Sequence, residues 1–140
     1  MDFTTSQIRN ITLAGHGQTG KTAFFEHLLY AGGSISKPES TESGKTVSEN
    51  SPEEIERKVS IYASLAHITW KNININVWDT PGSSDFAGEV IAAFRSTESA
   101  LMLIDGRSGA QIETIKLWRD LDRRNKLRMI FISVDRKSVV

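Results

Sequence analysis

Apolar runs alternate along the chain with segments whose apolar residues recur at helical spacing. The strand-like runs are residues 7–14, 100–104 and 128–134, and the helix-like segments are residues 22–31, 85–96 and 111–124. The run 100–104 is continuously apolar and the run 128–134 is apolar through residues 129–132, which is typical of buried parallel strands covered on both faces. The alternation predicts an α/β fold in which helices cover both faces of one sheet.

The middle of the chain has a different pattern. Ile73, Ile75 and Val77 alternate strictly with polar residues, so they share one face of a strand. A second extended run, residues 61–70, precedes it across a polar Lys-Asn pair. Two extended runs joined by two polar residues predict a β-hairpin. The sheet is therefore expected to be mostly parallel, with one antiparallel edge strand.

Helical spacing also predicts which side chains face the sheet. In the segment 85–96 these are Phe86, Val90, Ile91 and Phe94. In the segment 111–124 they are Ile112, Ile115, and Trp118 or Leu121.

Residues 34–52 are dominated by Ser, Thr, Glu, Lys, Gly and Pro. A loop of this length inside a domain is usually functional or disordered. We expect a mobile, switch-like loop over about residues 34–60, with one short helix from Pro52 to about Lys58. Ser51 is the predicted N-cap of that helix, and acidic residues follow in its first turn.

Composition is ordinary for a globular domain and excludes several kinds of site. The chain has 140 residues, enough for one domain with a real core, and its 17 Lys and Arg balance 17 Asp and Glu. We therefore expect no DNA partner. The absence of cysteine excludes disulfides, Cys-ligated zinc and thiol catalysis. The polar N-terminus and the shortness of every apolar run predict a cytoplasmic protein without a membrane partner.

The strongest chemical signal is the stretch Gly-His-Gly-Gln-Thr-Gly-Lys-Thr, which has the form G-x-x-x-x-G-K-[S/T] between a strand and a helix. Backbone N–H groups of such a loop cradle phosphate, and the helix N-terminus adds positive charge. Lys21 would reach the β- and γ-phosphates, and the Thr22 hydroxyl would bind Mg²⁺. The predicted nucleotide-binding residues are Gly15, His16, Gly17, Gln18, Thr19, Gly20, Lys21 and Thr22.

A second motif, Asp79-Thr80-Pro81-Gly82, follows the alternating strand and is predicted to reach the far side of the same phosphate. Asp79 would orient Mg²⁺, through a water. The backbone N–H of Gly82 would contact the γ-phosphate, where any side chain would obstruct the approach. A Pro-Gly turn that merely closes a strand is the alternative, and the upstream phosphate loop favours the functional interpretation.

A nucleotide switch also needs a hydroxyl that binds Mg²⁺ only when the γ-phosphate is present. Ser60, near the end of the polar segment, is the candidate. The candidate metal ligands are thus Thr22, Ser60 and Asp79. An ordinary serine at the entrance of a strand is the alternative interpretation of Ser60.

Taken together, the motifs GHGQTGKT, ERKVSI, DTPGSSDF and IDGRSGAQIET resemble the translational GTPases. Over residues 8–132 the chain is similar to the GTP-binding domain of elongation factor G, in particular to its elongation-factor-G-like paralogues. The resemblance implies a three-layer P-loop NTPase fold, GTP or GDP and Mg²⁺ as ligands, and GTP hydrolysis stimulated by the ribosome.

Three features depart from the family pattern. The family has a histidine after D-T-P-G that positions the attacking water, whereas this chain has Ser83, so we predict weak intrinsic hydrolysis. Lys21, Gly82 and Ser83 are the candidate catalytic residues. The family reads guanine with N-K-x-D, of which only Asp135 remains as a candidate base-reading residue. Family domains also continue further, so residues 1–140 are expected to be an incomplete, C-terminally truncated GTP-binding domain.

Two other functions stay open at this point. The altered base-reading motif is compatible with a P-loop protein of relaxed or adenine nucleotide preference. A binding module or inactive fragment that does not hydrolyse nucleotide is the other alternative. Competition between GTP and ATP, and loss of binding in Lys21→Ala, would separate these possibilities.

Overall fold

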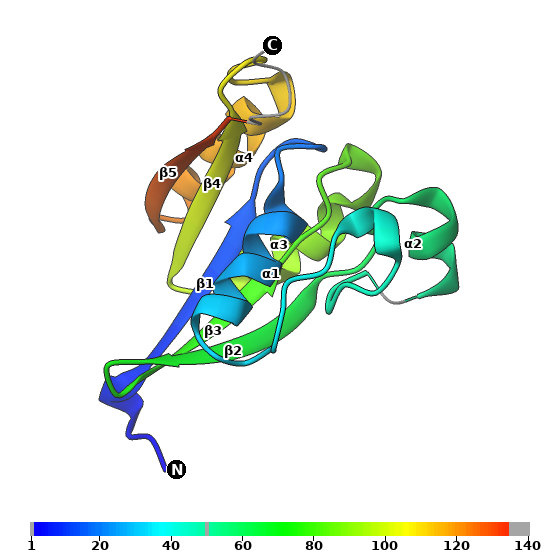
Figure 1. Ribbon diagram of the computed structural model, residues 1–140. Coiled ribbons are helices and arrows are strands. Elements are labelled where there is room, and N and C mark those ends of the chain that lie inside the picture. Colours follow the sequence, from blue (N-terminus) through cyan, green and yellow to red (C-terminus); the bar gives the residue numbers. More distant parts are fainter. Residues whose placement is uncertain (1, 50, 135–140) are drawn as a thin grey trace.

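The computed structural model contains one five-stranded sheet in the order β2-β3-β1-β4-β5 (Figure 1). The strands are β1 (Ile8–Ala14), β2 (Ser64–Trp70), β3 (Ile73–Asp79), β4 (Ser99–Asp105) and β5 (Leu127–Ser133). Neighbouring strands are parallel except for the antiparallel pair of β2 and β3. The structure describes residues 2–49 and 51–134. The predicted mostly parallel sheet with one antiparallel edge strand is confirmed.

Helices cover both faces of this sheet. The α-helices are α1 (Lys21–Ala31), α2 (Pro52–Arg57), α3 (Ala87–Ser96) and α4 (Ile112–Arg123). Short 3₁₀ turns are η1 (Thr5–Gln7), η2 (Thr41–Ser43) and η3 (Ser84–Phe86). Consecutive residues of β1 point to opposite faces, so Leu13 packs in the cluster that contains Phe25 of α1, and Ala14 in the cluster that contains Phe94 of α3. Three layers result.

The predicted hairpin turn and helix ends form. Lys71 and Asn72 both have positive φ, 48° and 62°, as a tight hairpin turn matched to the strand twist requires. Gly33 has a φ of 74° just after α1. Ser51 caps α2 by accepting a hydrogen bond from the N–H of Glu54 at 3.2 Å.

The predicted inner faces of two helices need correction. In α4, Ile112 is 68% exposed and Ile115 is 46% exposed, whereas Leu121 is buried. Its inner face is instead made by Thr114, Leu117, Trp118 and Leu121, at helical spacing. In α3, Ala93 is fully buried and Ile91 lies at the rim, because the small alanine lets the helix approach the sheet closely.

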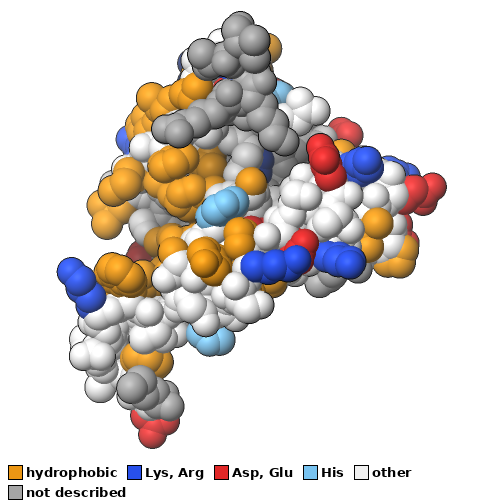
Figure 2. All heavy atoms as spheres, viewed as in Figure 1, with side chains coloured by type: hydrophobic (Ala, Val, Ile, Leu, Met, Phe, Trp, Pro, Cys, Tyr) orange, Lys and Arg blue, Asp and Glu red, His pale blue; other side chains and the backbone are white. Residues whose placement is uncertain are grey.

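The strand β5 forms as predicted, but the prediction that it is buried is wrong. It is the last strand in the sheet order, so it has a neighbour on one side only within the described part of the chain. Leu127 is 73% exposed and Met129 is 69% exposed. Figure 2 shows apolar side chains gathered on the face where β5 lies. The apolar run therefore predicted the strand, but not whether other elements pack against its faces.

None of the helices that the structure describes is long and apolar enough to cross a membrane.

The parallel pairing decides where the site forms. The register places Leu13 of β1 beside Asp79 of β3. The loop after β1 and the motif at the end of β3 therefore leave the sheet at adjacent strand ends, the edge at which ligands bind in open α/β sheets.

Candidate functional site

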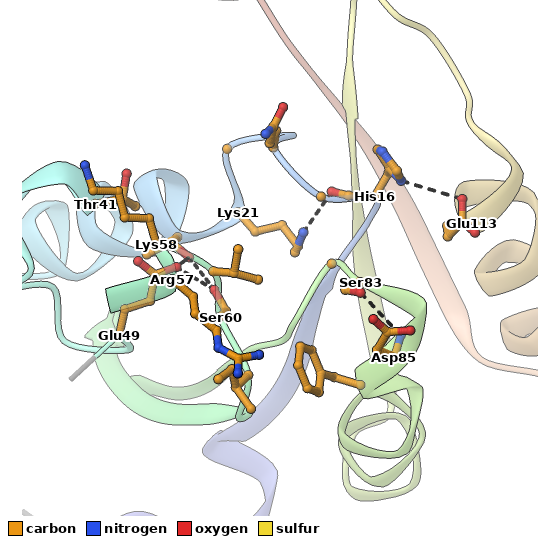
Figure 3. Close-up of a pocket in the computed structure, with 18 of the residues that line it drawn as sticks. His16, Lys21, Thr41, Glu49, Arg57, Lys58, Ser60, Ser83, Asp85 and Glu113 are labelled. Carbon is orange, nitrogen blue, oxygen red and sulfur yellow. Dashed lines mark hydrogen bonds and ion pairs between the residues drawn. The ribbon is translucent and has the colours of Figure 1, made fainter. Parts of the chain in front are cut away.

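Residues 15–20 form the loop that joins β1 to α1, and Lys21 and Thr22 open α1; most of these residues line a cavity (Figure 3). Two glycines are required by the backbone. A Cβ atom on Gly15 would lie 2.4 Å from the carbonyl oxygen of Leu103, and Gly20 has a φ of 85°. Thr19 braces the loop by donating its hydroxyl hydrogen to the carbonyl oxygen of His16 at 2.9 Å. The loop thus has the shape of a phosphate cradle at the start of a helix.

The ammonium group of Lys21 lies inside this loop. Its Nζ donates to the carbonyl oxygens of Gly15, at 3.0 Å, and His16, at 2.9 Å. The residue is only 6% exposed. Burial lowers the pKa of the Lys21 ammonium to about 8, although the negative charges of Asp79 and Glu49 act in the opposite direction. The loop therefore holds a fixed, poorly solvated positive charge that a phosphate would relieve.

Thr22 and Asp79 connect the two motifs. The Thr22 hydroxyl donates to Oδ2 of Asp79 at 2.9 Å. Asp79 is 1% exposed, and burial raises the pKa of its carboxyl group to about 6, against the Ser48 and Thr22 hydroxyls and the charge of Lys21. Oδ1 of Asp79 and the Ser48 hydroxyl are buried without a hydrogen bond of standard geometry. A buried carboxylate oxygen without a well-formed hydrogen bond is costly, which suits a site made for a cation.

Ser60 lies beside the Thr22 hydroxyl, together with the carboxylate of Glu49, which was not predicted from the sequence. The Ser60 hydroxyl donates to Oε1 of Glu49 at 2.6 Å and lies 3.4 Å from the Thr22 hydroxyl oxygen. Glu49 is 6% exposed, and its Oε1 is also 3.4 Å from the Thr22 hydroxyl. Together with Asp79 these groups form a set of oxygen donors, the ligand type that Mg²⁺ prefers. The residues present therefore fit the metal.

Glu49 was missed because nothing in its local pattern distinguishes it from the other glutamates of the polar segment. Its burial depends on how that segment returns to the sheet. The return is organised by Glu54 of α2, which is 2% exposed and accepts hydrogen bonds from the N–H groups of Ile61, at 3.0 Å, and Tyr62, at 3.2 Å. Burial alone would raise the pKa of Glu54, but these N–H groups keep it below its usual value. Ser60 immediately precedes this turn.

The second motif approaches the phosphate loop backbone to backbone. A Cβ atom on Gly82 would lie 2.6 Å from Cα of Gly17 and 2.7 Å from Nζ of Lys21. Thr80 and Pro81 are buried, and the Thr80 hydroxyl donates to the carbonyl oxygen of Leu13 at 2.7 Å. The motif is thereby fixed against β1, with Gly82 at the cavity.

Ser83 lines the same cavity, but its hydroxyl has a local role. It accepts a hydrogen bond from the N–H of Asp85 at 3.3 Å and so caps η3 (Figure 3). His16 points away from Lys21 toward Glu113 at the start of α4, with its Nδ1 3.6 Å from the carboxylate. The cavity measures about 880 Å³, and besides these groups Arg57 and Lys58 line it.

A second cavity of about 600 Å³ lies on the other side of the phosphate loop. Phe24 of α1 and Phe131 of β5 line it, with ring centroids 4.8 Å apart. The Ser133 hydroxyl at the end of β5 donates to the carbonyl oxygen of Thr19 at 2.9 Å, so β5 is tied to the phosphate loop. The candidate base-reading residue Asp135 lies outside the described residues.

Comparisons with known proteins show which family the chain resembles. Residues 6–137 match the family described as the elongation factor Tu GTP binding domain. Curated relatives include a mitochondrial ribosome-releasing factor 2 of Yarrowia lipolytica, 33% identical over 93% of this chain, and elongation factor G 2 of Streptomyces coelicolor, 32% identical over 90%. The tetracycline resistance protein TetW of Butyrivibrio fibrisolvens is 36% identical over 96%. The chain spans 16–22% of the length of these relatives.

Solved structures give the same result. A crystal structure from Thermus thermophilus superimposes with a TM-score of 0.88 at 28% identity, covering 91% of this chain and 19% of the other. Translation elongation factor SelB of Methanococcus maripaludis, solved with a GTP analogue, has a TM-score of 0.69 at 21% identity over 94% of this chain and 22% of its own, which shows the shared fold alone. The expected likeness to translational GTPases of the elongation factor G type is confirmed.

Proposed function

Because the chain belongs to the elongation factor Tu GTP-binding domain family, we propose that it acts as a Mg²⁺-dependent GTP/GDP switch in a translation factor of the elongation factor G type. The observation that carries this proposal is the convergence of Thr22, Asp79 and Ser60 beside the buried ammonium of Lys21. The start of α1, the end of the 34–60 loop and the end of β3 meet there.

In this proposal the chain's own groups divide the work. The loop N–H groups and Lys21 bind the phosphates, and Lys21 exchanges its two carbonyl partners for phosphate oxygens. Thr22, Ser60, Asp79 and Glu49 would hold Mg²⁺, directly or through water. Mg²⁺ held there would neutralise negative charge on the phosphates. Gly82 offers its backbone N–H to the γ-phosphate, since no side chain stands in the way.

We further propose that turnover is slow. Ser83 is short, and its hydroxyl already caps η3, so it is poorly suited to orient an attacking water. The imidazole of His16 is directed toward Glu113 instead of Lys21. Positioning of water and charge is most of what the protein contributes to this chemistry. Fast hydrolysis would then need a group from a partner.

The names of the relatives suggest the partner. Ribosome-releasing factor and elongation factor are names of proteins that act on the ribosome, so we propose the ribosome as the partner of this chain. The cytoplasmic location and the absence of a DNA or membrane partner stay predictions.

A second candidate function rests on the base side of the site. At the end of β5, Ser133 uses its hydroxyl on the Thr19 carbonyl, and Val134 is 62% exposed beside it. Neither side chain supplies the Asn or Lys of the family's guanine-reading motif. A P-loop nucleotide-binding module without GTP specificity or turnover is therefore the alternative.

Titration with fluorescent GDP in MgCl₂ and in EDTA tests the proposal. We expect binding that Mg²⁺ tightens, that GTP competes away, and that ATP displaces only at far higher concentration. Equal displacement by ATP would favour the alternative. No binding of any nucleotide would refute both.

A further inference from the structure

One buried carboxylate on α1 has no place in the phosphate chemistry. Glu26 is 1% exposed, and both of its oxygens accept hydrogen bonds from the backbone of the 34–60 loop. The N–H of Glu39 donates to Oε2 at 3.0 Å, and the N–H of Val47 donates to Oε1 at 2.5 Å. Charge-assisted hydrogen bonds of this kind are the strong ones. The loop is thus fastened to α1 at two points.

The second of these points is close to the metal-binding groups in sequence and in space. Glu26 follows Thr22 by four residues, so both lie on one face of α1, about 6 Å apart along its axis. Val47 precedes Glu49 by two residues, a distance that the chain spans in at most about 7 Å. The spacing between the two residues of the helix therefore matches the spacing between the two residues of the loop. Glu26 meets the backbone of Val47, and Thr22 meets the side chain of Glu49 at 3.4 Å.

The loop continues from Glu49 to the other metal-binding group. Glu49 accepts the hydrogen bond of Ser60, and the Ser64 hydroxyl donates to the Ser48 carbonyl oxygen at 3.0 Å. Figure 1 shows the part of the loop before Glu49, in cyan, passing from the end of α1 toward α2. A loop released from Glu26 would lose the contact that sets the position of Glu49, and Ser60 would lose its acceptor.

We propose that Glu26 is a positioning residue of the nucleotide switch, which holds the 34–60 loop so that Glu49 and Ser60 stand at the Thr22 hydroxyl. The inference rests on the proposed function for its ligand, a nucleoside phosphate with Mg²⁺. Glu26 itself touches neither phosphate nor metal. Its effect is confined to the contribution that Mg²⁺ makes to nucleotide affinity.

The first test measures the affinity for fluorescent GDP in MgCl₂ and in EDTA. Glu26→Gln keeps the size of the side chain, but an amide has one acceptor oxygen and presents an NH₂ group to the second N–H. We expect the tightening by Mg²⁺ to fall about tenfold, with the affinity in EDTA unchanged, because one charge-assisted hydrogen bond is lost. Glu42→Gln, an exposed residue of the same loop, makes the same charge change and should behave as wild type.

A shorter acidic residue at position 26 distinguishes the effect of side-chain length from the effect of charge. Glu26→Asp keeps the negative charge but is one methylene short of the two N–H groups, so the tightening by Mg²⁺ should fall here too. An Asp variant that behaves as wild type while the Gln variant is impaired would overturn the proposal in favour of simple electrostatics. A Gln variant with an unchanged response to Mg²⁺ would also overturn it.

The second test needs no nucleotide. The chain lacks cysteine, so Lys45→Cys places a fluorophore at one exposed site between the two fastened residues. We expect the anisotropy of the probe to fall when Glu26→Gln is added, while circular dichroism stays unchanged. Equal anisotropy overturns the proposal. If Mg²⁺ has no effect on nucleotide affinity in the wild type, but Glu26→Gln still lowers the anisotropy of the probe, the proposed switch is refuted. The attachment of the loop to Glu26 is then supported.

Discussion

The Thr22 hydroxyl and the Asp79 carboxylate are joined by a hydrogen bond of 2.9 Å, which connects the first turn of α1 to the end of β3. The residues are 57 positions apart in the chain. Because β1 and β3 are parallel neighbours, their carboxyl ends bring these two groups together. Each of the following predictions depends on this meeting point or on a segment that leads to it.

Removal of the Lys21 ammonium should weaken nucleotide binding. Lys21→Ala deletes a buried positive charge that faces the cavity, and a charge-assisted hydrogen bond contributes about 1.5–3 kcal/mol, or at least about tenfold in affinity. Titration with fluorescent GDP measures the loss. Lys37→Ala, whose side chain is 73% exposed and forms an ion pair with Glu39, is the matched control and should bind as wild type.

Asp79→Asn should stabilise the protein in EDTA and remove the effect of Mg²⁺ on nucleotide binding. The raised pKa, about 6 against an ordinary 3.8, means that the folded state holds its proton more tightly than the unfolded chain does. Stability is therefore lost as the pH rises from about 4 to 6, and the ionised carboxylate costs up to about 3 kcal/mol at pH 7.

Urea unfolding followed by tryptophan fluorescence at pH 4 and pH 7 measures this effect. The gain in free energy of unfolding from Asp79→Asn should be present at pH 7 and nearly absent at pH 4. A gain of the same size at both values would contradict the assigned cause, which is burial of the charge.

Ser83→His should accelerate GTP hydrolysis in the presence of ribosomes. An imidazole at this position reaches further than a hydroxyl, and a positioned water or base contributes about a hundredfold or more to such reactions. Single-turnover assays compare the variant with wild type. Ser84→His, one residue along and exposed, tests whether any nearby imidazole suffices. Equal and fast rates in all three proteins would show that Ser83 does not limit turnover.

Lys58→Gly should raise the free energy of unfolding by about 1 kcal/mol. Lys58 ends α2 with a φ of 51° and a ψ of 41°, the left-handed region in which a side chain is strained and glycine is not. Thermal unfolding gives the change. Lys58→Ala removes the charge and keeps the strain, so it should not stabilise the protein. If the alanine variant gains as much as the glycine variant, the charge and not the backbone is responsible.

The strand–loop–helix unit and the hairpin could be predicted because each is specified by neighbouring residues. Gly15 and Gly20 are needed where they stand, and the polar pair Lys71 and Asn72 forms the turn between the two extended runs. The meeting of Thr22 with Asp79 was predicted because each motif follows a strand, and the carboxyl ends of parallel strands lie at one edge of the sheet.

The remainder depends on contacts between distant segments. Neither Glu26 nor Glu49 differs in local pattern from an exposed glutamate, and only the return of the 34–60 loop over α1 buries both. The face of α4 was misassigned because two apolar stripes were available, and packing selected the one with Thr114 and Leu121. The exposure of β5 depends on what lies beside it, which its own apolar residues do not encode.

Gly82 lies so close to Gly17 that the two motifs leave no room for a side chain between them. A single methyl group at residue 82 would collide with the opposite backbone at 2.6 Å, so Gly82→Ala forces the 80–83 turn away from the phosphate loop. Such a chain should still grip the phosphates of GDP through Lys21 and yet lose any preference for GTP, which a comparison of the two affinities would reveal. One added carbon atom would then convert a switch between GTP-bound and GDP-bound states into a protein that binds both nucleotides in the same conformation.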